Sequence, residues 1–192
     1  VDNINRAIKR ATGEGGEGIE EFEEVIYEGY GPGGGAILLQ ALTTNRNRTA
    51  SDVRSTFNKG GGNLGESGCV AWNFESKGVL TIEIDDPDRA DELSLVAIES
   101  EADDVKHEDG ILEVQTTPDN LSSVQKALEV EGVSFASSDI SLVPKTTISL
   151  DDKTAEQTLR LLDNLEDLGD VQKAFTNADF SLEVLEKYQD NS

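Results

Sequence analysis

The chain has 192 residues, of which 36% are hydrophobic, and this is enough for a core in one large domain or two small ones. Its formal net charge of −23 argues at first against nucleic acid as a partner. No apolar run approaches the roughly 20 residues that span a bilayer, and one cysteine with one histidine excludes an intrachain disulfide, a zinc site and a histidine-activated nucleophile. We therefore expect a non-enzymatic protein that needs no cofactor or metal.

The negative charge is distributed unevenly. Residues 1–78 carry a net charge of −3, whereas residues 79–192 carry −20. Residues 45–78 carry +2 and form a basic island in an acidic chain. The acidic second half would face either a basic partner or only water, and a high-salt environment would also explain so many carboxylates.

Two short stretches open the chain. In Asp2–Arg10, Ile4 and Ile8 share one helical face, which predicts the last turns of a helix. Gly13–Gly18 is rich in Gly and Glu, as is typical of a flexible linker. A domain boundary is therefore expected near residue 20.

A strand, a tight turn and a second strand follow the linker. Val25–Tyr27 and Ala36–Leu42 are β-branched and aliphatic, as strands usually are. The segment Gly29–Gly35 between them contains five glycines and one proline, so it predicts a turn.

A helix is expected next. Thr49 is followed by Asp52 three residues later, which is the spacing of a capping box at a helix start. Val53 and Phe57 fall on one helical face, and Gly60–Gly62 would end the helix.

A third strand completes this part of the chain. The apolar residues Val70, Trp72 and Phe74 alternate with other residues, which predicts a half-buried strand. The predicted order of elements up to residue 76 is β-β-α-β.

The start of the predicted helix is the candidate functional site. Asn45–Arg48 contains two arginines and two asparagines, and a helix start presents free backbone N–H groups with a partial positive charge. Phosphate or another anion suits such a place. The alternative is that Arg46 and Arg48 are solvated loop charges or pair with Glu side chains. The predicted nucleic-acid-binding residues, spread as a basic strip around the helix, are Asn45, Arg46, Asn47, Arg48, Arg54 and Lys59.

Residues 77–148 show a β-α-β-β-α-β pattern, the split βαβ arrangement of a ferredoxin-like domain. Asp109–Gly110 is a type I′ hairpin signal, and Asp85 or Asp86 would cap the first helix. The predicted elements are a strand at Val79–Ile84, a helix from Pro87 to about Ala102, strands at Val105–Glu108 and Ile111–Thr116, a helix from Pro118 and a strand at Phe135–Val143.

Two elements remain without a sheet of their own. They are a helix at Asp152–Leu168, with Leu159, Leu162 and Leu165 on one face, and a strand at Val171–Phe175. The simplest solution is that they complete the first β-β-α-β group. We therefore predict an α+β protein in which residues 21–76 and 149–180 form one discontinuous domain, 77–148 an inserted ferredoxin-like domain and 181–192 a C-terminal tail.

Several motifs resemble the YebC/PmpR family. They are EGYGPGG, TTNRNRTASDVR, GGNLG and GCVAWNFESKGV; in addition, DNINRAIKRATG resembles the family's DNIERAIKKGTG, and LEDLGDVQKAFTNADF resembles its LEDLDDVQNVYHNADF. The chain departs from the family at Gly35 and Ala36, where apolar residues are commoner, and in its acidic second half. Family members begin with a basic helical domain, so the resemblance implies that residues 1–20 are the remnant of that domain with its linker.

The resemblance implies a regulator of gene expression. Family members are described as DNA-binding transcriptional regulators, and the mitochondrial ones as translational activators at the ribosome. The chain has no recognition-helix motif, and glycine-rich loops with Arg and Asn suit the shape of RNA, so we favour RNA and the ribosome. We expect a cytoplasmic monomer (mitochondrial for an organellar member) that avoids membranes and binds nucleic acid chiefly through the preceding basic domain. The alternative is an acidic interaction module that docks on a basic protein.

Overall fold

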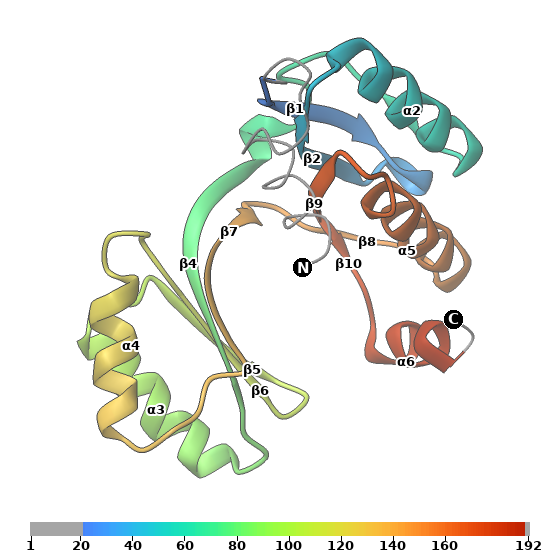
Figure 1. Ribbon diagram of the computed structural model, residues 1–192. Helices are drawn as coiled ribbons and strands as arrows, with labels where there is room; N and C mark the ends of the chain where they lie inside the picture. Colours follow the sequence, from blue (N-terminus) through green and yellow to red (C-terminus); the bar gives the residue numbers. More distant parts are fainter. Residues whose placement is uncertain (1–20, 191–192) are drawn as a thin grey trace. The chain divides into compact units, whose positions relative to one another are not determined.

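The computed structural model describes residues 21–190, which fall into two compact units (Figure 1). The first unit contains residues 21–73 and 144–190, and the second unit is Phe74–Val143. The predicted α+β class, with a ferredoxin-like domain inserted into a discontinuous one, is confirmed. The predictions for Asp2–Arg10 and Gly13–Gly18 lie outside the described residues.

The first unit is built on a four-stranded antiparallel sheet. The strand order is β3-β1-β2-β9, with β1 at Glu23–Tyr30, β2 at Ala36–Thr43, β3 at Asn63–Leu64 and β9 at Val171–Thr176. A 3-10 turn (η1, Pro32–Gly34) joins β1 to β2, and Gly33 and Gly34 have φ values of 75° and 84° that favour glycine. The predicted strand–turn–strand is therefore present.

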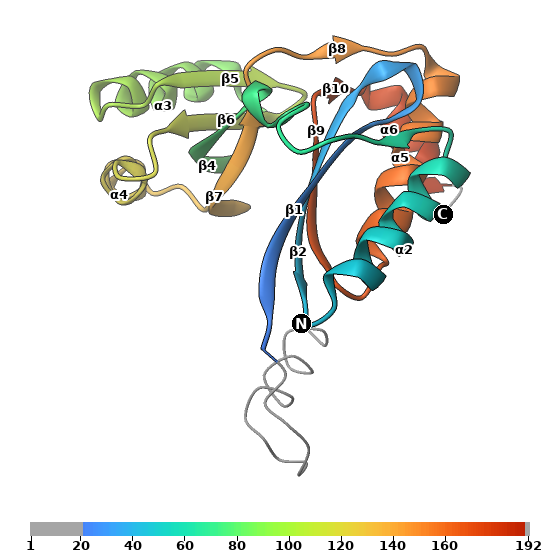
Figure 2. The same ribbon diagram turned by 90° about the horizontal axis from the view of Figure 1, so that it is seen from above.

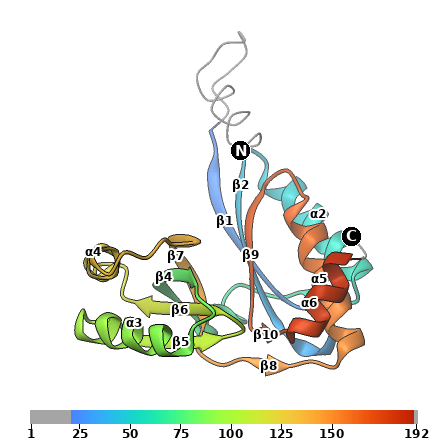
Figure 3. The ribbon, with the colours of Figure 1, turned by 90° about the horizontal axis from the view of Figure 1, so that it is seen from below.

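Helices α2 (Arg46–Lys59) and α5 (Asp152–Glu166) lie side by side on one face of this sheet (Figures 2 and 3). The core combines residues from before and after the second unit, because α5 and β9 follow it in the chain. Its buried members are Val25, Tyr27, Ile37, Leu39, Ala41, Val53, Phe57, Leu161, Leu165 and Val171. The inward face of α5 was predicted only in part. Leu162 packs against the cluster, but Leu161 is the fully buried residue and Leu159 is not in the cluster.

A second, two-stranded parallel sheet was not expected from the sequence. Its strands are β8 (Ile148–Ser149) and β10 (Ala178–Asp179), and helix α6 (Leu182–Asp190) follows. Next to it, the buried Asn73 side chain accepts a hydrogen bond from Thr146 N at 3.1 Å and donates one to Thr146 O at 3.0 Å. This amide joins the segments where the chain leaves the first unit and returns to it.

The strand predicted across Val70–Phe74 is wrong. Ala71–Asn73 forms a 3-10 turn (η2), and Phe74 begins β4, which belongs to the second unit. Trp72 is 67% exposed instead of half-buried. The cause is a buried carboxylate from β1, described below.

The second unit has the strand order β5-β6-β4-β7, and its two helices pack on one face of the sheet (Figure 1). Asp86 caps the first helix as predicted, and Asp109 and Gly110 have the positive φ values of the predicted hairpin, 55° and 76°. The second helix begins at Leu121 and not at Pro118. The elements are β4 (Phe74–Glu83), α3 (Pro87–Glu99), β5 (Asp104–Glu108), β6 (Ile111–Thr116), α4 (Leu121–Val130) and β7 (Ser137–Pro144).

Its core contains Leu80, Ile82, Leu93, Ala97, Leu112, Val114, Val124 and Leu128. In the part of the chain that the structure describes, no helix is long and apolar enough to cross a membrane.

Candidate nucleic-acid interface

The first turn of α2 is organised by Asn45. The helix begins at Arg46, and the Asn45 side-chain oxygen accepts a hydrogen bond from Arg48 N at 3.1 Å. The predicted cap at Thr49 is therefore wrong, and Thr49 is a buried residue of the first turn. Asn45 has a non-helical backbone, as a cap should (φ −145°, ψ 89°), and asparagine caps helices at least as well as threonine does.

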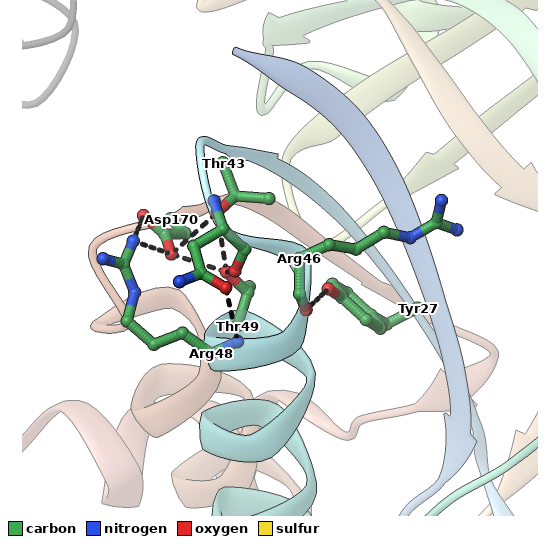
Figure 4. A network of polar contacts seen from close by, with 7 residues as sticks. Tyr27, Thr43, Arg46, Arg48, Thr49 and Asp170 are labelled. Carbon is green, nitrogen blue, oxygen red and sulfur yellow. Dashed lines mark hydrogen bonds and ion pairs between the residues drawn. The ribbon is translucent and has the colours of Figure 1, made fainter. Parts of the chain in front are cut away.

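A carboxylate of the chain itself lies beside this turn (Figure 4). Asp170 Oδ2 is 2.6 Å from Thr49 Oγ1, 2.9 Å from Arg48 Nη2 and 3.2 Å from Thr43 Oγ1. Burial raises the pKa of Asp170, but the hydrogen bonds from Thr49 and Arg48 outweigh it and hold the pKa below its ordinary value. Arg48 thus has an acidic partner, as the alternative interpretation expected, although that partner is an Asp and not a Glu.

Arg46 points in a different direction. Figure 4 shows its side chain extending away from Asp170, and its ion pair with Glu23 is 3.9 Å long between side chains that are 67% and 49% exposed. An ion pair between side chains this exposed contributes little to the stability of the fold. The Arg46 backbone carbonyl accepts a hydrogen bond from the Tyr27 hydroxyl at 3.2 Å, so the start of the helix is fixed to β1 while the guanidinium faces solvent.

The remaining predicted residues lie further along or around α2. Asn47, Arg54 and Lys59 are all exposed, and neither cation has an ion-pair partner among residues 21–190. Lys59 is in the last turn, about 20 Å from the helix start at 1.5 Å per residue. There it lines a shallow depression with Asn164. The structure therefore gathers the four residues 45–48 at one end of the helix and leaves Lys59 at the other.

The bonds of Asp170 lead to a pH-dependent prediction. The pKa of Asp170 is lower in the folded state than in the unfolded state, so its ionised carboxylate stabilises the fold. This contribution to the free energy of unfolding is complete above the unfolded pKa, near 4, and is lost as the pH falls through the pKa of the folded state. Asp170→Asn should lower the free energy of unfolding by about 1 kcal/mol at pH 7. The difference in free energy of unfolding between this variant and the parent chain should shrink below about pH 4.

Urea unfolding at a series of pH values measures this difference. Asp139→Asn, which removes an exposed carboxylate elsewhere, is the matched control for the change in net charge. An effect of Asp170→Asn that equals the control at every pH would contradict the role given to Asp170.

A different carboxylate, which is buried, organises the loop that follows β3. Glu28 of β1 is only 4% exposed, and it accepts hydrogen bonds from the backbone N–H groups of Gly68, Val70 and Ala71 at 2.6, 2.8 and 2.7 Å. Burial raises the pKa of Glu28, but these three bonds outweigh it and hold the pKa below its ordinary value. Because its N–H groups turn toward one carboxylate, this segment does not form a strand.

Sequence reasoning missed Glu28, Trp72 and Asp170. The only sequence signal for Glu28 is an acidic residue directly after the apolar residues Val25–Tyr27 of β1. Cys69 lies in the same loop, and burial, with the nearby Glu28 carboxylate, raises the pKa of its thiol. A protonated thiol at neutral pH agrees with a packing role. Within residues 21–190, no group of three or more His, Cys, Asp or Glu side chains is arranged to hold a metal ion.

Comparison with known proteins assigns the chain to a family. The family model described as "TACO1/YebC second and third domain" matches residues 22–178. The chain belongs to the TACO1/YebC family. The resemblance to YebC/PmpR proteins seen in the motifs is thereby confirmed.

Individual relatives are similar over nearly the whole chain. A probable transcriptional regulatory protein of Moorella thermoacetica is 50% identical over 97% of this chain and 74% of its own length. One of Halothermothrix orenii, with the same name, is 48% identical over the same shares. The crystal structure of a conserved hypothetical protein from Aquifex aeolicus matches with a TM-score of 0.75 and 43% identity, over 96% of this chain and 75% of that one. The chain therefore belongs to a family of regulators of gene expression.

Proposed function

We propose that this TACO1/YebC chain is part of a non-enzymatic factor that regulates gene expression by associating with RNA on the ribosome. The observation that carries the proposal is the exposed side of α2. Residues 46–59 include four cations and one carboxylate in a chain whose net charge is −23. A cationic helix surface in an otherwise acidic protein directs a polyanion to that surface. We also propose that the protein is cytoplasmic. A basic domain that precedes residues 21–190 would add to its affinity for RNA.

The backbone around α2 suits a close approach by a phosphate chain. Helix α2 ends at Gly60–Gly62, where the exposed Gly61 has a φ of 79° and presents its backbone without a side chain. At the other end, Asn45, Asn47 and Arg46 are exposed hydrogen-bonding side chains. Arg and Asn at a helix start can contact phosphate and 2′-hydroxyl groups by shape, without reading a base sequence.

RNA is favoured over duplex DNA by the neighbours of α2. The helix follows strand β2 and precedes strand β3, and its inward face packs on the sheet and on α5. A DNA-reading helix-turn-helix has a second helix a few residues away and projects its recognition helix into the major groove. The connections of α2 do not match that arrangement.

Arg46→Ala with Arg54→Ala tests the proposal. Both side chains are exposed, and Arg48 is left in place because it pairs with Asp170. In the natural protein, the double variant should weaken binding to a short single-stranded RNA several-fold. It should also reduce the slope of log affinity against log salt by roughly one unit for each phosphate that the variant no longer neutralises. Fluorescence anisotropy over a range of KCl concentrations gives both quantities.

The matched control is Lys126→Ala with Lys153→Ala, which removes two exposed positive charges from other elements. If the slope changes equally in both double variants, net charge alone matters and α2 is not the interface. If duplex DNA is bound more tightly than RNA, the preference for RNA is wrong.

The second unit favours an alternative partner. Residues 74–143 contain 18 Asp and Glu against 4 Lys and Arg. On the sheet of this unit, the isoleucines Ile111 and Ile140 are 43% and 55% exposed. Carboxylates around exposed apolar side chains suit a basic protein surface. Under this alternative, crosslinking of the natural protein would recover a basic protein through residues 74–143 and no nucleic acid.

A further inference from the structure

Two aromatic side chains, Trp72 of the loop that Glu28 binds and Tyr30 at the end of β1, lie at one place on the surface. Trp72 is 67% exposed and Tyr30 is 36% exposed. The indole Nε1–H donates to the Cys69 carbonyl oxygen at 2.9 Å, and the Tyr30 hydroxyl donates to the same oxygen at 3.1 Å. The two rings are therefore anchored at a single point.

The loop that carries Trp72 is fixed by buried groups. The Glu28 carboxylate binds three of its N–H groups. Val70, just before the turn, and Asn73, at its end, are 1% and 3% exposed. Trp72 is thus a large apolar side chain displayed by a fixed turn, with its one polar atom already satisfied. Tryptophan is highly buried on average, so its display on an ordered loop needs a reason.

A positive charge lies at the backbone of Trp72. The Lys145 ammonium donates to the Trp72 carbonyl oxygen at 3.2 Å, and no carboxylate within residues 21–190 forms an ion pair with it. An exposed aromatic ring with a cation bound to the same backbone segment is an arrangement by which proteins hold single-stranded nucleic acid. The ring stacks on a base, and the cation contacts the phosphate beside that base.

We propose that Trp72 is a stacking platform for an unpaired nucleic-acid base, with Tyr30 beside it and Lys145 directed to the adjoining phosphate. This inference rests on the proposed function and extends it from phosphate binding on α2 to a site for a base. A duplex does not offer such a base, so the site selects single-stranded segments, loops or bulges.

The chain offers a direct probe, because Trp72 is its one tryptophan. Titrating the chain with a short single-stranded RNA should quench the tryptophan fluorescence. The same strand with abasic positions keeps the phosphates but lacks bases, and it should quench far less. Trp72→Ala should weaken RNA binding about tenfold, whereas Trp72→Phe should retain most of the affinity because it keeps a ring. Leu95→Ala, which removes a side chain 63% exposed in the second unit, is the matched control and should leave binding unchanged.

The outcomes separate this inference from the proposed function. RNA binding by anisotropy without quenching, or equal quenching by the abasic strand, overturns the stacking site and leaves the proposed function in place. No binding of RNA by the natural protein contradicts both. If Trp72→Ala does not fold, as judged by circular dichroism, the parent chain still tests whether a base stacks on Trp72, because its quenching by base-containing and abasic strands can be compared. Quenching by a basic protein and not by RNA would identify the platform as a protein-binding surface and overturn the inference.

Discussion

Glu28→Gln is expected to lower the free energy of unfolding of the first unit by about 2–4 kcal/mol. The carboxylate is 4% exposed and accepts three backbone hydrogen bonds from the loop at Gly68, Val70 and Ala71. An amide offers only one acceptor oxygen and turns its own N–H₂ group toward at least one of these donors. The loss should appear in urea unfolding followed by the fluorescence of Trp72, which belongs to the first unit.

The effect of Glu28 should also depend on pH. Its pKa is lower in the folded state, so the carboxylate stabilises fully above the unfolded pKa, near 4.5, and this contribution disappears as the pH falls through the folded value. Glu24→Gln, at an exposed position of the same strand, is the matched control and should change stability by no more than about 0.5 kcal/mol. Equal stabilities of the two variants at pH 7 would show that Glu28 does not organise the loop.

Leu161→Ala should destabilise the first unit by about 2–5 kcal/mol, the usual cost of a cavity in a packed core. Leu161 is 1% exposed and lies in the cluster with Val53 and Phe57 of α2. It also packs so closely on the Gly60–Gly62 turn that a Cβ added at Gly60 would lie 2.7 Å from Leu161 Cδ1. The same urea titration measures the loss.

The control for this prediction is Leu159→Ala in the same helix. Leu159 is only half-buried and lies outside the cluster, so its truncation should cost about 1 kcal/mol or less. If both variants were equally mild, α5 would not complete the core of the first unit, and the discontinuous arrangement would lose its energetic basis.

Much of the fold follows from local patterns in the sequence. Val53 and Phe57 repeat with the helical period and are buried, and Asp86 before Pro87 starts α3 as a cap should. The Asp109–Gly110 dipeptide forms its hairpin, since a type I′ turn needs positive φ at both positions. These features depend on residues close together in the chain, so a single sequence reveals them.

The errors involve partners that are distant in the chain. The alternation of Val70, Trp72 and Phe74 suggested a strand, but Glu28, some 40 residues earlier, binds the loop N–H groups instead. Arg48 could be recognised as part of a helix start, yet its partner Asp170 is 122 residues away. Tertiary contacts of this kind leave no local pattern, and for the same reason the display of Trp72 could not be predicted.

One measurement tests the central claim most directly: ultraviolet crosslinking of the full-length protein in living cells, followed by sequencing of the recovered nucleic acid and mapping of the crosslinked peptides. We expect ribosomal RNA to be enriched over DNA, with crosslinks in the peptides that contain Arg46–Lys59 and Trp72. Recovery of DNA without RNA would contradict the proposed action at the ribosome. Recovery of proteins alone, through residues 74–143, would contradict nucleic-acid association as a whole and favour the acidic interaction module.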